Sequence, residues 1–316
     1  MDNVVREIRK SKKIAIIPHI SADGDALGSS FGIALALKKI NKSVDVFLEE
    51  DIPQVYNFLP GKELEKEFKY ESGFYDLVIA IDSGDVKRLG ARSELFERGI
   101  KTINIDHHET NTFFGFHNWI EKKASSVGEM IYKLLKELNI ELDKEISTCL
   151  YVAISADTGG FRFSNTTAYT HKIISELVSF GIDIADISRK IFDSISFSKL
   201  ILMSRAINNT EIIEKGKVSI ITLKDKETNI KGLRNEDYDG IINIGRNLHG
   251  VEVCILFREL LNKEIKINFR SNYYVDVAKI ANMYKGGGHK RAAGCIQKGK
   301  LEEVKKWVLE DIIKEI

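Results

Sequence analysis

Four short segments of the chain combine aspartate and histidine in patterns suited to metal binding. They are HISADGD (residues 19–25), AIDSGD (80–85), DHH (106–108) and ADTG (156–159). Brought together, they would supply at least four carboxylates and two or three imidazoles. Carboxylates packed so closely repel one another unless cations neutralise their charge. The sequence therefore predicts a metal site, with enough carboxylates to suggest two ions.

The place of each segment in the chain indicates how the four could meet. Each follows a short apolar run of the kind that forms a strand, at residues 14–17, 77–81, 102–105 and 150–154. In an α/β sheet, the residues just past the carboxyl ends of parallel strands converge on one crevice. We therefore expect all four segments at strand ends, around a single crevice.

Strands alternate with helices through the first half of the chain, which predicts an α/β fold with a doubly wound, mostly parallel sheet. The expected strands cover residues 13–18, 43–48, 76–81 and 102–105, and a helix covers residues 26–40. The pattern then becomes helical over residues 126–138, 144–155, 167–180 and 184–191. Beyond residue 217 the segments are rich in β-forming residues again, which indicates a second, smaller α/β domain.

A length of 316 residues suits two domains, at residues 1–191 and 211–316, joined by a helical linker at 192–210. The longest apolar runs are too short to span a membrane, and the N-terminus does not resemble a signal peptide. The three cysteines are widely scattered, as is usual for buried thiols in a reducing compartment. These features predict a cytoplasmic protein with no membrane partner.

The net charge of +1 conceals an asymmetry between the two parts of the chain. Residues 201–316 hold 21 Lys and Arg against 16 Asp and Glu, whereas residues 1–200 hold 26 against 30. The acidic part contains the candidate metal ligands, so the basic part is the natural place to bind an anion. Ordinary scatter of surface charge would also produce such a difference.

The first segment places Asp23 and Asp25 two residues apart, with His19 four residues before Asp23. Gly24 lets the backbone bend sharply between the two aspartates, so that they could face different metals. An isolated D-x-D is more often a turn or a helix cap. Its combination with Asp82, at the expected end of a strand, and with the DHH tripeptide makes metal binding the better interpretation.

Two further segments could contact a substrate. Arg162, in the run DTGGFRF, could reach a phosphate, although the flanking aromatic residues are typical of a core. The run from Gly286 through Gly287 and Gly288 to His289 could expose its amides to an anion without obstruction by side chains. A flexible hairpin would have the same glycines, but the basic residues that follow favour a phosphate site.

The four acidic segments, in this order and at these spacings, resemble those of the DHH phosphoesterases. The Gly-Gly-Gly-His run resembles the DHH-associated domain that follows in that family, so that the resemblance covers essentially the whole chain. Within the family, the chain is most similar to the bacterial nanoRNases that also act as pAp phosphatases. The resemblance implies two Mn²⁺ ions per chain, for which Mg²⁺ or Co²⁺ could substitute.

The resemblance also implies a role for each residue of the first domain. One metal would be held by His19, Asp23 and Asp82, and the other by Asp25, Asp82, His107 and Asp157. Asp106 and His108 would then be catalytic residues. We expect Asp106 to orient His107 through its second ring nitrogen, unless it is only a turn residue. His108 would face the substrate phosphate or protonate the leaving oxygen.

In the second domain, Arg270 and Ser271 match a further anion-binding element of the family, beside the Gly286–His289 loop. The implied substrates are very short RNA and pAp, which would be hydrolysed by metal-activated hydroxide. The alternatives are a phosphodiesterase acting on cyclic di-AMP or linear dinucleotides, and a non-catalytic nucleotide-binding regulator. A homodimer is compatible with the sequence.

Overall fold

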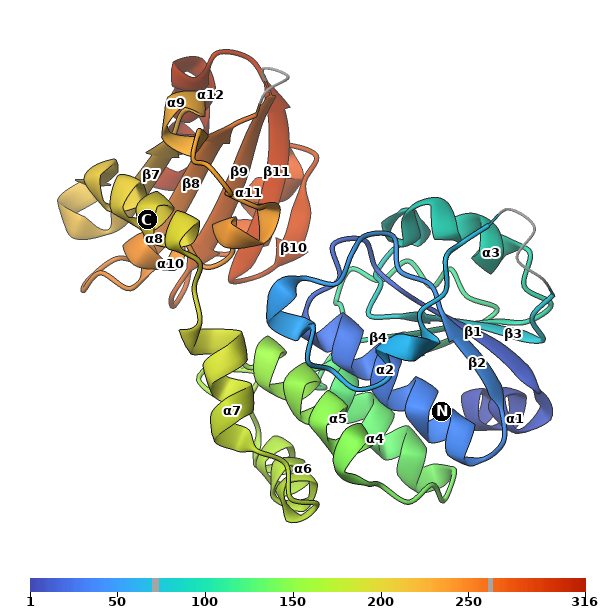
Figure 1. Ribbon diagram of the computed structural model, residues 1–316. Helices are drawn as coiled ribbons and strands as arrows, with labels where there is room; N and C mark the ends of the chain where they lie inside the picture. Colours follow the sequence, from blue (N-terminus) through green and yellow to red (C-terminus); the bar gives the residue numbers. More distant parts are fainter. Residues whose placement is uncertain (70–73, 261–263) are drawn as a thin grey trace. The chain divides into compact units, whose positions relative to one another are not determined.

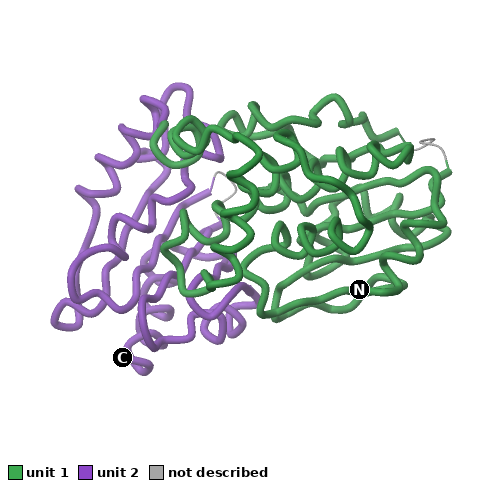
Figure 2. The backbone as a smooth tube through the Cα atoms, turned by 90° about the horizontal axis from the view of Figure 1, so that it is seen from below, with its two compact units in different colours: residues 1–194 green, residues 195–316 purple. Residues whose placement is uncertain are grey.

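The computed structural model describes residues 1–69, 74–260 and 264–316 and divides into two compact units, Met1–Ser194 and Ile195–Ile316. Figure 2 shows the two units in different colours. Each unit has its own sheet, as the alternation of strands and helices predicts. In the described ranges, no helix combines the length and apolar character that crossing a membrane requires.

The sheet of the first unit consists of five parallel strands in the order β2-β1-β3-β4-β5 (Figure 1). The strands are β1 (Lys13–Pro18), β2 (Ser43–Val46), β3 (Leu77–Ile81), β4 (Thr102–Asp106) and β5 (His117–Ile120). The parallel, doubly wound fold class is therefore confirmed. The sequence HNWI of β5 was not predicted as a strand, because it is short and lacks an apolar run.

Helices and helical turns cover both faces of this sheet. The helices of the unit are α1 (Asp2–Lys10), α2 (Gly24–Lys39), α3 (Ser93–Glu97), α4 (Val127–Glu137), α5 (Lys144–Asp157), α6 (Ala168–Ser179) and α7 (Ile184–Ser188). On one face, Ile14 and Ile16 of β1 lie in the large core with residues of α2, α4 and α5. On the other face, Ala15 and Ile17 pack with residues of α3.

Asp157 is the last residue of α5, so the helical pattern of residues 144–155 is confirmed. The expectation that this segment follows a strand, like the other three, is wrong. The apolar run at residues 150–154 is buried because α5 packs between other elements, and a short buried run has no period that separates strand from helix.

Glycines allow α2 and α5 to pack closely, which brings their ends to the same place. A Cβ atom at Gly24 would lie 2.5 Å from the Cβ of Ala156, and one at Gly28 would lie 2.4 Å from the backbone oxygen of Cys149. Gly32 completes the row, one helical turn further along. Since Gly24 begins α2 and Ala156 precedes Asp157, this packing sets Asp157 beside the first turn of α2.

Gly28→Ala is expected to lower the free energy of unfolding by about 1–3 kcal/mol, the usual cost of overpacking. The new methyl group would meet backbone, which cannot move aside easily. Gly32→Ala is the matched comparison, since its methyl group would meet the flexible side chain of Leu150 at 3.1 Å. Urea unfolding measures both, and an equal or smaller loss for Gly28→Ala would contradict the close packing.

The second unit contains a mixed sheet of six strands in the order β10-β11-β9-β8-β7-β6, in which only β7 and β8 are parallel. The strands are β6 (Thr210–Ile213), β7 (Val218–Leu223), β8 (Val253–Glu259), β9 (Glu264–Ser271), β10 (Gly287–His289) and β11 (Ala292–Lys298). The helices are α8 (Phe197–Asn208), α9 (Asp225–Thr228), α10 (Asn243–Arg246), α11 (Val277–Met283) and α12 (Leu301–Ile313).

The two faces of this sheet have separate cores. Residues of α11 and α12 fill one core, and Leu202 and Ala206 of α8 lie in the other, with Cys254 and Leu256 of β8. The helix that we expected in a linker, α8, thus contributes buried residues to the second unit.

The expectation that residues 286–289 form a loop is wrong for three of these four residues. Gly287–His289 forms the edge strand β10, in antiparallel register with β11. A Cβ atom at Gly286 would lie 2.2 Å from the backbone oxygen of Gly294, and one at Gly288 would lie 2.4 Å from that of Ala292. These two glycines therefore permit the close approach of two strands, in addition to any contact with an anion.

Candidate metal centre

The first unit brings all the predicted metal ligands together in three overlapping groups. They are His19, Asp23 and Asp82; Asp25, His107 and Asp157; and Asp82, His107 and His108, with the donor atoms of each group within 4.8 Å of one another. The ligands come from the carboxyl ends of β1, β3 and β4, from the start of α2 and from the end of α5. Asp82 and His107 each belong to two groups.

His19 and Asp23 lie on the two sides of the turn between β1 and α2. Asp23 caps α2, because its Oδ1 accepts hydrogen bonds from the amides of Asp25 at 3.0 Å and Ala26 at 3.1 Å. The Nε2 atom of His19 lies 3.9 Å from Asp23 Oδ1 and 3.6 Å from Asp82 Oδ2. The D-x-D motif is therefore a helix cap and part of a ligand group at once.

Asp25 is buried at the start of a second helix as well as its own. Its carboxylate accepts hydrogen bonds from the amides of Val127 at 2.6 Å and Gly128 at 2.9 Å, in the first turn of α4. Amides and the positive end of a helix dipole favour a carboxylate there. Burial nevertheless raises the pKa of Asp25 well above its ordinary value, and the charges of Asp82 and Asp157 raise it further.

Asp82 lies at the centre of the site, one residue after β3, with a positive φ of 56°. A positive φ is uncommon outside glycine and is found where the surrounding structure imposes it. Its Oδ1 atom lies 3.8 Å from His107 Nε2 and 3.6 Å from His108 Nδ1. Burial opposes ionisation of Asp82, but the neighbouring histidines outweigh it and lower its pKa.

Asp106 supports His108 and not His107, contrary to the expectation from sequence. Asp106 Oδ1 lies 2.6 Å from His108 Nδ1, whereas His107 Nδ1 lies 3.1 Å from the carbonyl oxygen of Ala124. The reason is the alternation of side chains along extended backbone, which puts residues 106 and 108 on the same side and residue 107 on the other. Burial lowers the pKa of His108, but the hydrogen bond to Asp106 and the charge of Asp82 raise it overall.

Asn111 is a supporting residue that no sequence motif indicated. It is buried, and its Nδ2 donates to Asp106 Oδ2 and to the carbonyl oxygen of Ser83, which joins the ends of β3 and β4. Arg88 was also missed: its Nη2 lies 2.9 Å from His19 Nδ1. A single asparagine or arginine outside a motif carries no signal of its position in space.

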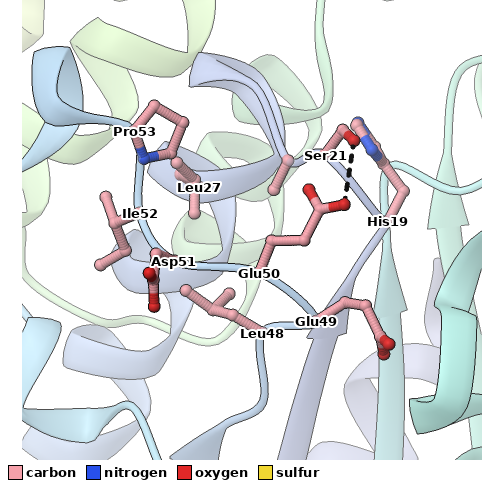
Figure 3. A pocket seen from close by; sticks show the side chains of 10 residues that line it. His19, Ser21, Leu27, Leu48, Glu49, Glu50, Asp51, Ile52 and Pro53 are labelled. Atoms are coloured by element: carbon pink, nitrogen blue, oxygen red, sulfur yellow. Dashed lines mark hydrogen bonds between the residues drawn. The ribbon is translucent and has the colours of Figure 1, made fainter. Parts of the chain in front are cut away.

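A small pocket lies beside His19 (Figure 3). Glu49, Glu50 and Asp51 line it from the segment after β2, together with Ser21, whose hydroxyl donates to Glu50 Oε1 at 3.3 Å. The pocket therefore extends the acidic character of the site to one side of His19.

The donor set fits metal ions. Asp82 Oδ1 is buried and has no hydrogen-bond partner among the described residues, so a group that accepts its lone pairs is required. The chemistry of the ligands, carboxylate oxygen with imidazole nitrogen and no thiolate, suits Mn²⁺ or Mg²⁺ better than structural zinc. A buried group of like-charged carboxylates is stable when cations neutralise it.

Metal binding is expected to raise the melting temperature more at pH 8 than at pH 5. Burial raises the pKa of Asp157 from 3.8 to about 7, and the charges of Asp157 and Asp82 raise that of His107 from 6.5 to about 9 despite its burial. The metal-free folded protein thus holds more protons than the unfolded chain across this interval, and its stability falls as the pH rises.

Ligands must lose these protons to bind a metal, so the gain from metal increases with pH. The lowered pKa of Asp82 acts below pH 3.8, outside the comparison. Thermal unfolding with Mn²⁺ and with chelator, at both pH values, measures the effect. The same gain at pH 5 and pH 8 would contradict proton competition at this cluster.

The remaining predicted residues belong to none of these ligand groups. Arg162 is exposed, and its Nε donates to the carbonyl oxygen of Gly159 at 2.6 Å. In the second unit, Arg270 lies on β9 beside Cys254 of β8, and burial lowers its pKa. Ser271 is buried and its hydroxyl donates to the carbonyl oxygen of Val275 at 2.7 Å, while His289 is exposed at the end of β10.

Comparison with known families and proteins agrees with this organisation. The DHH family, N-terminal domain, matches residues 13–154, and the DHHA1 domain matches residues 215–315. A Thermus thermophilus protein named bifunctional oligoribonuclease and PAP phosphatase NrnA is 30% identical, over 99% of this chain and 94% of that protein. A Bacillus subtilis protein of the same name is 28% identical, over 92% and 91%.

A solved structure has the same fold over nearly its whole length. The crystal structure of an exopolyphosphatase-related protein from Bacteroides fragilis is similar with a TM-score of 0.89 and 29% identity. The similarity covers 99% of this chain and 95% of that one.

Proposed function

This chain belongs to the DHH family of phosphoesterases, and from this premise we propose that it is a manganese-dependent hydrolase of very short RNA and of pAp. The observation that carries the proposal is the set of three ligand groups linked through the buried Asp82 and His107, each of which belongs to two groups. All six predicted metal ligands are present in these groups, which argues against a non-catalytic member of the family. The names of the two bacterial relatives support the choice of substrates.

Two metals held by these residues would activate a shared water and neutralise the charge that develops on the phosphoryl oxygens. One ion would be held by His19, Asp23 and Asp82. The other would be held by Asp25, Asp82, His107 and Asp157. Mg²⁺ and Co²⁺ offer similar ligand preferences and could substitute for Mn²⁺.

His108 is suited to donate a proton to the leaving oxygen. Its Nδ1 is held by Asp106 at 2.6 Å, and its pKa is raised, so that the protonated form persists to higher pH. A general acid works best when its pKa lies near the working pH. His108 also lies in one ligand group with Asp82 and His107, so it is close to the reacting centre.

The second unit would anchor the substrate by a terminal phosphate. Arg270 offers a planar set of donors, and no carboxylate of the described residues forms an ion pair with it. Together with His289 and the exposed Gly287, it would bind one end of a short substrate. Arg162 of the first unit would add a further phosphate contact.

Arg270→Ala and His289→Ala are expected to lower kcat/KM for pAp by about 10- to 150-fold each, the value of a charge-assisted hydrogen bond of about 1.5–3 kcal/mol. Bis-p-nitrophenyl phosphate has no terminal phosphate, so its hydrolysis should change little. The measurement is kcat/KM on both substrates with saturating Mn²⁺. Equal losses on both would place these residues in catalysis or folding instead.

A panel of substrates tests the proposed function itself. The purified protein with Mn²⁺ is given pAp, a dinucleotide, a five-nucleotide RNA, cyclic di-AMP and pyrophosphate. Fastest hydrolysis of pAp and the short RNAs is the expected result. Preference for cyclic di-AMP would favour the dinucleotide phosphodiesterase alternative, and turnover that persists in excess chelator would contradict metal dependence.

A further inference from the structure

One face of the second sheet carries a group of cations, of which the anchoring of a terminal phosphate uses only Arg270. Arg258 of β8 and Lys266 and Arg270 of β9 share this face, and we call them the basic row (strands in Figure 1). Residues that alternate with them, such as Phe257 and Ile267, are buried in the core on the opposite face. Among the residues that the structure describes, no carboxylate forms an ion pair with any member of the row.

Arg258 and Lys266 are direct cross-strand partners in the antiparallel register of β8 and β9. Like charges in such a pair destabilise a sheet. Burial lowers the pKa of Lys266, and the charge of Arg258 lowers it further. An anion bound between the two side chains would relieve this repulsion.

The carboxylates nearby are few. The charge of Asp239 acts on both Lys266 and Arg270, but that of Arg246 opposes it at Arg270. Glu264 is the acidic residue of β9 on this face, and its Oε1 atom lies 3.6 Å from Lys298 Nζ. The face therefore has a local excess of positive charge.

Arg258 is held in place but has unused hydrogen-bonding capacity. Its guanidinium stacks on the ring of Tyr238, 3.8 Å from the ring centroid. Its Nε atom is buried and has no hydrogen-bond partner among the described residues. A guanidinium that is already ordered loses little entropy on binding an oxyanion, and its planar donors suit phosphate.

The spacing of the row favours an extended polyanion over a single phosphate. Lys266 and Arg270 are four residues apart on β9, which corresponds to about 13 Å along an extended strand. Asn268 lies between them on β9 and is the partner of Gly294 on β11, so that strand places no side chain opposite its amide. Ile296, 53% exposed, is the partner of Lys266 on β11 and offers apolar surface to a ribose or base.

We propose that Arg258 and Lys266 bind a backbone phosphate of a short single-stranded oligonucleotide that runs along β9 past Arg270. The inference rests on the proposed function and deepens it. It adds a phosphate contact beyond Arg270, which would serve substrates longer than a dinucleotide but not pAp. An acidic peptide would satisfy the charges alone, but not the alternation of cations with an amide and an apolar surface.

The test is binding of the full-length protein in chelator, where no turnover occurs, to pAp, to a five-nucleotide RNA and to a poly-glutamate peptide. The double variant Arg258→Gln/Lys266→Gln should bind the five-nucleotide RNA at least about 10-fold more weakly and bind pAp as the wild type does. The slope of log K against log salt for the RNA should decrease by about 0.7, the value for one lost phosphate contact.

Lys279→Gln/Lys306→Gln removes the same charge from exposed positions of α11 and α12, and serves as the matched control. The single variant Lys266→Gln guards against misfolding of the double variant, because it leaves Arg258, whose Nε is buried, in place. The inference is overturned by unchanged RNA binding, by an equal loss for pAp, by an equal loss in the control, or by poly-glutamate binding as tight as RNA binding. If the wild type hydrolyses neither pAp nor short RNA with Mn²⁺, the proposed function fails instead.

Discussion

Asp82→Ala is expected to lower kcat/KM by about 10³- to 10⁴-fold on every substrate. Among the described residues, Asp82 is the one carboxylate that belongs to two ligand groups, and it uses different oxygens to face His19 on one side and His107 on the other. Its loss would release both metals, which contribute several kcal/mol of transition-state stabilisation. A fall of 10³- to 10⁴-fold in kcat/KM corresponds to about 4–6 kcal/mol. Steady-state kinetics on pAp and on a generic phosphodiester measure it.

The control is Glu109→Ala, which removes an exposed carboxylate next to the DHH tripeptide but outside the ligand groups. It should leave both activities within about twofold of wild type, because single surface substitutions rarely matter. Metal content after dialysis and circular dichroism show whether the Asp82 variant is folded and metal-free. A folded Asp82 variant that keeps more than a tenth of the activity would contradict the shared metal site.

His107→Ala and Asp157→Ala are each expected to slow turnover by about 10²- to 10³-fold, equivalent to about 3–4 kcal/mol. The two side chains lie 3.4 Å apart in the ligand group with Asp25, so each loss weakens the same ion. Residues that act as a unit are not additive. The double variant should therefore be little slower than the slower single variant.

The comparison is the double variant His19→Ala/His107→Ala. Its two substitutions affect different ligand groups, so its turnover should be slower than that of either single variant. Calorimetric titration with Mn²⁺ gives an independent measure, since the His107 and Asp157 variants should each lose one of two binding events. Multiplicative losses for His107 and Asp157 together would mean that they do not hold a common ion.

Two features of the site follow regular spacings that can be read in the sequence. If the alternation of β4 continues past Asp106, residues 106 and 108 point to the same side, which agrees with the pairing of Asp106 with His108. The assignment of Asp106 to His107 was wrong because it relied on adjacency in the chain. In the same way, the spacing of Gly24, Gly28 and Gly32 is that of a helix contact, although only the structure shows α5 as the partner.

The family, the parallel sheet of the first unit and the list of candidate aspartates and histidines could all be predicted from the sequence. Order and spacing carry these, because strand ends in such a sheet converge on one edge. The three-dimensional structure was needed to show which ligands share a group, that Asp157 reaches the site from the end of a helix, and that β10 is a strand. Asn111, Arg88 and the basic row also required it. These features depend on contacts between residues far apart in the chain, which no local pattern records.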